Sequence, residues 1–179
     1  ILKEDGMQYY DNGNGKYIAL SPIDRSSIKE VNIKSGTTEI NQYAFYYCDN
    51  LTSVSLPNSV TSIGSYAFSG CSSLSSINIP DGVTSIGSYA FSDCSNLTSI
   101  DMTNVVDWDN LTLGSSSFNT TASTSAPTVI TISSNADIQT VISKLTSSVI
   151  GSSMTNKIKL TNGTSNYVWN GSGWDLQTA

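Results

Sequence analysis

The sequence contains no histidine, and this absence removes several kinds of chemistry at once. Histidine is the commonest general base, the commonest metal ligand and the usual switch near neutral pH. Serine is abundant, but a serine nucleophile needs a base beside it. The lysines, the alternative base, lie only towards the two ends of the chain. We therefore expect that the protein is not an enzyme and has no catalytic residue, metal site or cofactor.

Positive charge is absent from the whole middle of the chain. No lysine or arginine lies between Lys34 and Lys144, while the chain as a whole has a net charge of −6. Such a surface cannot neutralise phosphates, so we expect no nucleic acid partner, and anionic lipid is a poor candidate. No apolar run approaches the roughly 20 residues of a membrane-spanning helix, so we expect no membrane insertion by this segment. The chain opens at Ile1 without a basic-then-apolar segment, and we expect that any leader was removed or left out.

Only three cysteines are present, Cys48, Cys71 and Cys94, and they recur at a constant 23-residue step. An odd number at constant spacing is not a disulfide framework, and no C-x-x-C pair offers a zinc or redox site. We predict that all three are reduced and buried as small apolar side chains.

The sequence does contain a 23-residue repeat. The segment at 40–45 recurs at 63–68 and again at 86–91, and a partial copy begins near residue 28. The register then holds to residue 102 without an insertion, which indicates stacked, ordered coils despite the many serines and threonines. The repeated columns include the tyrosines 43, 66 and 89, the phenylalanines 45, 68 and 91, and the leucines 51, 74 and 97.

Each copy also contains the spacing L-x-x-L-x-L, which is typical of the strand of a leucine-rich repeat. Side chains two residues apart share one face of such a strand, and the following proline, Pro57 or Pro80, ends it. We expect Gly64 and Gly87 to permit the bend that follows. One coil buries too little apolar surface to offset the ordering of its own backbone, so the coils have to stack.

The columns Ile-Gly-x-Tyr-Ala-Phe-x-x-Cys-x-x-Leu-x-x-Ile-x-Ile-Pro resemble the BspA-like type of bacterial leucine-rich repeat, over roughly residues 28–102. The resemblance implies an α/β repeat fold, namely a short right-handed leucine-rich-repeat solenoid of 23-residue coils. It also implies a bacterial protein that is secreted or displayed at the cell surface. Members of this family are associated with attachment to host matrix proteins or to other cells, and the family has no catalytic residues to carry over.

The two flanks depart from the repeat and are predicted to cap it. Residues 1–27 place strand formers on both sides of the turn sequence at 11–15, which predicts a β-hairpin cap. Residues 28–127 form the solenoid and its degenerate end, where 113–118 resembles one more plug of the coil interior. Residues 128–179 predict a small α/β cap with a strand, a helix whose N-cap is Ser134, a second strand and a hairpin around Asn170 and Gly171.

Two sets of side chains are candidates for binding. Tyr43, Tyr66 and Tyr89 should stack along one edge of the solenoid; tyrosines are common at interfaces, but a structural aromatic ladder explains this column equally well. The second set is a small, polar surface on the predicted strand face, where leucine-rich repeats bind their partners. It consists of Thr52, Ser53, Ser55, Ser75, Ser76, Asn78, Thr98, Ser99 and Asp101.

Paired carboxylates that hydrolyse a sugar bond are the enzymatic alternative, with Trp108 as a platform for the sugar. The candidate carboxylates are Asp81, Asp93, Asp101, Asp107 and Asp109. Asp81 and Asp93 occupy positions typical of solvated turns. The run 107–110 offers oxygen ligands for calcium but lacks the longer loop that calcium sites need, so a turn is favoured there too.

We therefore predict an extracellular, non-enzymatic binding or adhesion module that recognises a protein or glycan partner on host or neighbouring cells. The alternative is a structural spacer within a larger surface protein, and a carbohydrate-active enzyme comes third.

Overall fold

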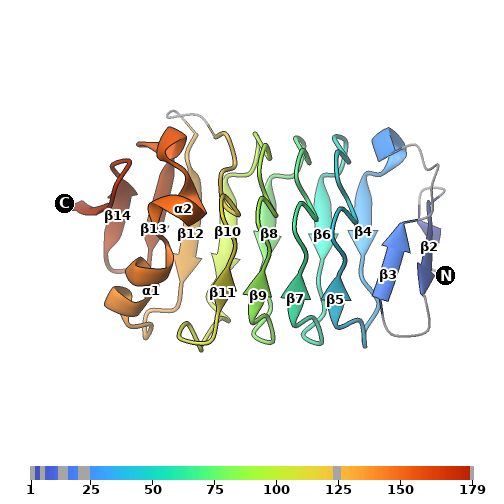
Figure 1. Ribbon diagram of the computed structural model, residues 1–179, viewed down its shortest axis with the longest axis horizontal. Helices are drawn as coiled ribbons and strands as arrows, with labels where there is room; N and C mark the ends of the chain where they lie inside the picture. Colours follow the sequence, from blue (N-terminus) through green and yellow to red (C-terminus); the bar gives the residue numbers. More distant parts are fainter. Residues whose placement is uncertain (1–2, 5–6, 12–15, 20–24, 123–125, 178–179) are drawn as a thin grey trace.

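The computed structural model describes residues 3–4, 7–11, 16–19, 25–122 and 126–177, with side chains for 25–122 and 126–177. The chain forms one elongated stack of coils, with the N-terminal hairpin at one end and the C-terminal strands and helices at the other (Figure 1). The predicted solenoid is confirmed.

One side of the stack is a seven-stranded sheet made of very short strands. Its order is β1-β2-β3-β5-β7-β9-β11. The strands from β3 to β11 pair in parallel, one coil after the next. Their bounds are β1 Lys3–Glu4, β2 Met7–Asp11, β3 Lys16–Ala19, β5 Glu39–Ile40, β7 Ser62–Ile63, β9 Ser85–Ile86 and β11 Thr112–Leu113.

The other strand of each coil belongs to a second face. There β4 pairs with β6 in a two-stranded sheet, and a six-stranded sheet follows in the order β8-β10-β12-β13-β14-β15. The bounds are β4 Glu30–Asn32, β6 Ser53–Ser55, β8 Ser76–Asn78, β10 Ser99–Met102, β12 Thr128–Ile132, β13 Ile158–Thr161, β14 Asn166–Trp169 and β15 Trp174–Gln177. Helices α1 (Ile138–Lys144) and α2 (Ser147–Ile150) lie near the C-terminal end, and 3₁₀ turns cover Arg25–Ser27 and Ser152–Met154 (Figure 1).

The core lies between the two faces and is built from the repeated columns. Leu51, Leu74 and Leu97 are fully buried, as the unbroken register predicts. The phenylalanines form a parallel stack in which Phe68 and Phe91 have ring centroids 5.5 Å apart and an interplanar angle of 1°. Phe118 continues this stack at 6.0 Å from Phe91, so the expected plug at 113–118 is present. Each coil therefore covers the apolar surface that its neighbour exposes.

The sequence predicts that Gly64 and Gly87 permit the bend after each short strand, but the structure places the bend on other residues. Gly64 and Gly87 have ordinary backbone angles, and the left-handed conformation falls on Tyr43, Tyr66 and Tyr89, with φ of 59°, 58° and 58°. The glycines are needed for another reason: a Cβ on Gly64 would lie 2.5 Å from the backbone nitrogen of Gln42 in the preceding coil. The column is glycine because two backbones approach there, not because the chain turns there.

The stack continues past Met102, where the 23-residue sequence register ends. One more step from Ile86 would reach Asp109, but Ile86 pairs with Leu113 instead, so this coil is four residues longer. On the other face β12 pairs in parallel with β10, and β13 with β12. Backbone pairing thus carries the solenoid further than the side-chain columns indicate.

Both flanks contain antiparallel strand pairs. At the N-terminus β2 pairs with β3, around a predicted turn whose residues 12–15 lie outside the described part of the chain. At the C-terminus β14 pairs with β13 and β15, as the hairpin signal predicts. The predicted N-cap of the helix is wrong by one turn: the Asp137 carboxylate, not Ser134, accepts the backbone N–H groups of Gln139 and Thr140. An aspartate directly before the helix competes better for those donors than a serine three residues earlier.

Candidate functional surface

A ladder of stacked tyrosines runs along one edge of the solenoid. The rings of Tyr43 and Tyr66 are 5.0 Å apart with an interplanar angle of 16°, and those of Tyr66 and Tyr89 are 4.9 Å apart with an angle of 12°. Each tyrosine donates its backbone N–H to the next coil, Tyr43 to the carbonyl of Ser65 and Tyr66 to that of Ser88. The left-handed turn therefore fixes the direction of every ring, and the predicted stacking is present.

Two further tyrosines enlarge this ladder in the first full coil. Tyr46 contacts Tyr43 and Tyr47 edge-on, with centroids 5.2 and 4.5 Å apart, and approaches Tyr66 at 6.1 Å. We call Tyr43, Tyr46, Tyr47, Tyr66 and Tyr89 the tyrosine cluster. The sequence distinguishes the two extra members, because the later coils have Ser69-Gly70 and Ser92-Asp93 where the first full coil has Tyr46-Tyr47.

Three of the five tyrosines of the cluster are exposed, and Tyr46 and Tyr66 are half-buried. Tyr47 exposes 55 % of its surface, Tyr43 43 % and Tyr89 37 %. Desolvation raises the pKa of the phenols of Tyr46 and Tyr66, and neighbouring tyrosines add to this shift. These phenols therefore stay neutral at physiological pH and remain both donors and acceptors.

Arg25 holds the backbone beneath the cluster. Its Nη1 donates to the carbonyl oxygen of Tyr46 at 2.8 Å, and to those of Tyr43 and Ala44 at 3.3 Å each. A single cation thereby satisfies three carbonyls of one turn, which fixes the turn that carries most of the exposed rings. The repeat does not predict this contact, because Arg25 lies one 23-residue step before Cys48, at a column that is otherwise cysteine.

The polar strand face is also formed as expected, but part of it is used within the fold. Ser53, Ser55, Ser76 and Asn78 are exposed on β6 and β8, whereas Ser99 and Asp101 are half-buried. The remaining members, Thr52, Ser75 and Thr98, are exposed just before these strands.

Several hydroxyl and carboxylate groups of this face already have partners. The Thr52 hydroxyl donates to the carbonyl of Lys29, and that of Thr98 to the carbonyl of Ser75. Asp101 accepts the backbone N–H and the hydroxyl of Thr103 at 2.9 and 2.7 Å. The groups left to meet a partner are mainly the serines of β6 and β8.

The comparison with known families identifies the repeat. Residues 23–149 match the family described as the BspA type leucine-rich repeat region, in six copies. This match covers well over half of the chain. The protein belongs to the BspA type leucine-rich-repeat family. Among proteins with a curated description, none matches.

Three solved structures resemble this BspA type chain. A leucine-rich repeat protein from Bacteroides ovatus is 30 % identical with a TM-score of 0.50, over 59 % of this chain and 25 % of its own. The Treponema pallidum leucine-rich repeat protein is 20 % identical with a TM-score of 0.48, over 70 % and 68 %. A leucine-rich cell surface protein from Faecalibacterium prausnitzii is 23 % identical with a TM-score of 0.26, over 50 % and 38 %. This chain thus spans a quarter of the length of the Bacteroides protein.

The cysteines of the BspA type coils are structural side chains. All three are free and buried, as predicted. Desolvation raises the pKa of Cys48 to about 11 and that of Cys94 to about 12. The thiol of Cys71 donates to the carbonyl of Phe45, and that of Cys94 to the carbonyl of Phe68. With no thiolate at physiological pH, this column has little nucleophilic reactivity.

The proposed platform for a sugar at Trp108 is wrong, because Trp108 is a core residue with only 4 % of its surface exposed. It belongs to the fourth coil, the one that contains Phe118, after the coils of Phe45, Phe68 and Phe91. Asp107 makes a turn, since its carboxylate accepts the backbone and the side-chain amide of Asn110, and these hydrogen bonds lower its pKa. Within the described part of the chain, no group of three acidic or sulfur side chains is placed to hold a metal ion.

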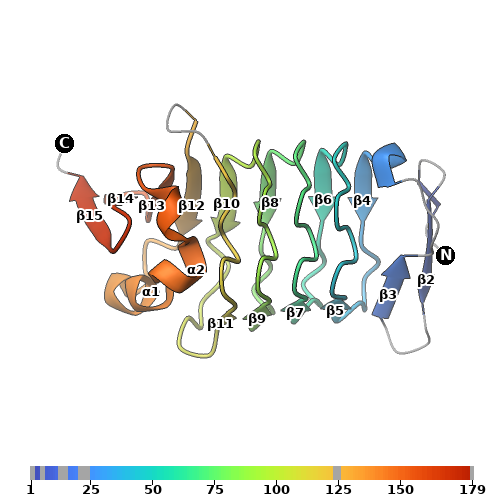
Figure 2. The ribbon, with the colours of Figure 1, turned by 45° about the horizontal axis from the view of Figure 1, so that its top comes forward.

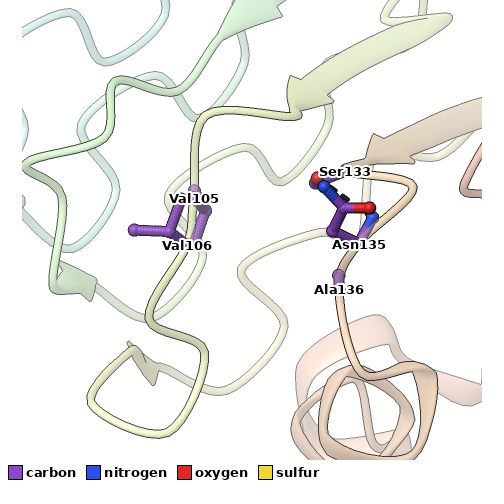
Figure 3. A pocket seen from close by; sticks show the side chains of 5 residues that line it. All are labelled: Val105, Val106, Ser133, Asn135 and Ala136. Atoms are coloured by element: carbon purple, nitrogen blue, oxygen red, sulfur yellow. Dashed lines mark hydrogen bonds between the residues drawn. The ribbon is translucent and has the colours of Figure 1, made fainter.

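A small hollow lies between the longer fourth coil and the segment after β12. Val105 and Val106 face Ser133, Asn135 and Ala136 across it (Figure 3). Its volume is about 120 Å³, and an adjoining hollow beside Asp107 measures about 140 Å³. Both are below the roughly 300 Å³ at which small-molecule sites begin, so we assign them no ligand.

Proposed function

We propose that this chain is a non-enzymatic binding module that holds a protein or glycan partner outside the cell. The observation that carries this proposal is the tyrosine cluster. Tyrosine, with tryptophan and arginine, dominates the energetics of interfaces, because it combines a large apolar ring with a hydroxyl that hydrogen-bonds. Solubility alone does not account for five tyrosine side chains gathered along one edge of the solenoid.

Rigidity supports the same proposal. Every ring of the cluster contacts at least one other ring, and those of the ladder stand on a backbone hydrogen-bonded to the next coil. Side chains that are already ordered lose little conformational entropy when a partner arrives, which favours affinity. The exposed serines of β6 and β8 add neutral hydrogen-bonding groups on the second face.

The partner should be recognised by neutral contacts. No lysine or arginine lies between Lys34 and Lys144, and the acidic residues of the coils are scattered. Steering by charge needs clusters of one sign, because ions screen single exposed charges beyond about 8–10 Å at ordinary salt. We expect the dissociation constant to change little between low and high salt.

Display outside a bacterial cell and a role in adhesion are inferences from family membership. The resemblance of the coils to BspA-like repeats supports secretion or attachment at the surface. Within the described residues, no helix is both long and apolar enough to cross a membrane.

The test is a screen of the intact chain on arrays of glycans and matrix proteins, followed by Tyr43→Ala and Tyr47→Ala. Both rings are strongly exposed, so their loss should weaken binding about tenfold or more without unfolding the coil. Leu176→Ala removes an equally exposed apolar side chain far along the stack and should have no effect. Retained binding in both tyrosine variants would show that the cluster is structural.

A structural spacer is the second candidate. It is favoured by the coverage of the Bacteroides ovatus protein, in which a region like this one is a quarter of a longer chain. A chain that retains no ligand on any array, yet folds stably, would support the spacer.

A further inference from the structure

The outer face of the C-terminal strands contains a hollow of about 390 Å³. It lies on four neighbouring strands, β12, β13, β14 and β15, and therefore outside the tyrosine cluster and the repeated columns. Its volume falls within the range of ordinary small-molecule sites. Its lining consists of Val129, Lys159, Thr161, Asn166, Val168 and Gln177.

The strand register arranges these six side chains in two rows. In the first row Lys159 pairs with Val129 on one side and with Val168 on the other. Neighbouring strands are about 5 Å apart, so the Lys159 side chain leaves the sheet between two small apolar side chains. The second row joins Thr161 to Asn166, and Asn166 to Gln177. One row is thus apolar with a central charge, and the other offers only neutral hydrogen-bonding groups.

The hollow follows from the change of strand direction. The strands from β8 to β13 are parallel, and the last hairpin is antiparallel; Figure 2 shows β15 inclined to the strands before it. The lining combines the short side chains of Val129, Val168 and Thr161 with the longer ones of Lys159 and Gln177.

The charge of Lys159 is available to a ligand. Within the described residues its ammonium has neither an ion-pair nor a hydrogen-bond partner, and the residue is exposed. Two carboxylates share this face without lining the hollow: Asp175 lies beside Val168, and Asp101 lies two strands from Thr161. Asp175, which pairs with Val168, accepts the side-chain amide of Asn170 at 2.9 Å, and Asp101 accepts from Thr103.

We infer that this hollow binds a sugar unit that carries a carboxylate, such as a uronic or sialic acid residue. Lys159 meets the carboxylate, and Thr161, Asn166 and Gln177 meet hydroxyl groups. The two valines contact the C–H face of the ring. Lys159 is the one charged side chain in the lining, so the site matches one negative charge, whereas a phosphate would call for a second cation or a bidentate arginine. The site does not depend on the tyrosine cluster.

The hollow is shallow, so affinity for one sugar unit should be weak, with a dissociation constant on the order of 1 mM. Repeated acidic units on a polymer would raise the apparent affinity through multivalency when several copies of the protein are displayed together. Unlike binding at the tyrosine cluster, this interaction should weaken as salt rises.

The experiment is a titration of the intact, ¹⁵N-labelled protein followed by amide chemical shifts. The probes are glucuronic acid and N-acetylneuraminic acid, with glucose as the neutral match and acetate as the bare carboxylate. We expect saturable shifts at the amides of Val129, Lys159 and Val168 with at least one acidic sugar, and about tenfold weaker binding of glucose and acetate. Lys159→Gln should weaken binding by the same factor.

Matched controls distinguish this site from nonspecific attraction of anions to lysine. Lys157→Gln removes a neighbouring lysine that does not line the hollow, and Tyr43→Ala alters only the tyrosine cluster; both should bind acidic sugars normally. Binding of acetate as tight as that of glucuronic acid would reduce the site to a simple anion contact and overturn the assignment to a sugar. Tighter binding of a glutamate-rich peptide, or no shift at the lining residues with either acidic sugar, would overturn it as well.

Discussion

At the scale of single residues, neighbouring columns of the repeat have different structural roles. The tyrosine column takes the left-handed backbone, and the glycine column makes room for the next coil. A Cβ on Gly87 would lie 2.7 Å from the carbonyl carbon of Gly64 and closer still to the nitrogen of Ser65. Both are backbone atoms that cannot move aside without separating two coils.

Gly87→Ala should therefore destabilise the protein by about 1–3 kcal/mol, the usual effect of overpacking. The matched control is Gly173→Ala, because a Cβ at Gly173 meets no atom within 4 Å and its φ is ordinary. Urea unfolding followed by circular dichroism measures both. Equal stability of the two variants would show that the coils can separate at this point at little cost.

The difference between these columns also shows how far the sequence predicts the structure. Spacing predicts burial, because a side chain that recurs at every 23-residue step and is always apolar has to face the shared core. Spacing does not predict backbone angles: tyrosine rarely adopts positive φ, so Tyr43 gave no sign that it carries the turn. The contact of Arg25 with three carbonyl groups was missed for a similar reason, since arginine occurs only once in a column that is otherwise cysteine.

At the scale of the element, the tyrosine ladder ends one coil before the phenylalanine stack does. The fourth coil has Ser116 where the earlier coils have tyrosine, yet its φ of 53° is nearly the same, and its N–H also donates to the next segment, at Ser148. The backbone for a fourth ring is thus present without the ring.

Ser116→Tyr should place a ring on the open face of Tyr89 and raise the free energy of unfolding by about 0.5–1.5 kcal/mol, the value of an aromatic pair. Ser116→Ala, which adds no ring, serves as the control. Thermal unfolding and the near-ultraviolet circular dichroism of the stacked tyrosines would detect the change. A lower melting temperature for Ser116→Tyr than for Ser116→Ala would mean that α2 leaves no space there.

Helix α1 offers a pH-dependent test of its cap. Hydrogen bonds from Thr140 and Gln139 lower the pKa of Asp137. The stabilisation by the carboxylate is therefore present above the ordinary aspartate pKa of about 3.9, and it is lost as the pH falls through the lower value of the folded state.

Asp137→Asn should consequently unfold at a lower urea concentration than the wild type at pH 7, and the gap should close as the pH falls below about 4. Ser134→Ala, at the position that the sequence favoured as the cap, should leave the midpoint unchanged at both pH values. A gap that is the same at pH 7 and pH 3 would contradict a role for the ionised carboxylate.

At the scale of the whole molecule, the pairing of backbones continues where the pairing of columns fails. The sequence predicts coils to residue 102, but the six-stranded sheet runs on through β12 and β13 into the C-terminal flank. Hydrogen bonds between strands do not require particular side chains, so the strands stay paired although a four-residue insertion in the fourth coil breaks the 23-residue register. The strands and the C-terminal hairpin were nevertheless predictable, because alternating apolar residues and Asn170-Gly171 are local signals. We propose that residues 1–27 and 128–179 act as the two caps, since their strands pair with the first and last regular coils.

Removal of one whole coil should be tolerated. Deleting residues 64–86 joins Ile63 to Gly87 and keeps every column in register, so the shortened chain should fold with a lower melting temperature but the same circular dichroism per residue. Deleting residues 64–85 instead leaves one residue too many and should prevent cooperative folding. Equal behaviour of the two deletions would argue against a stack held in register by its columns.

The orientation of the bonds between coils also has a mechanical consequence. Bonds such as Gly64 N–H to the carbonyl of Ile40, and Gly87 N–H to that of Ile63, join each coil to the next and so run along the length of the stack (Figure 1). A force that pulls the two ends apart loads these bonds one coil at a time instead of shearing many together. Each released 23-residue coil would lengthen to about 80 Å when extended. Under tension, the protein should therefore yield at low force and in equal steps, as an extensible tether rather than a rigid rod.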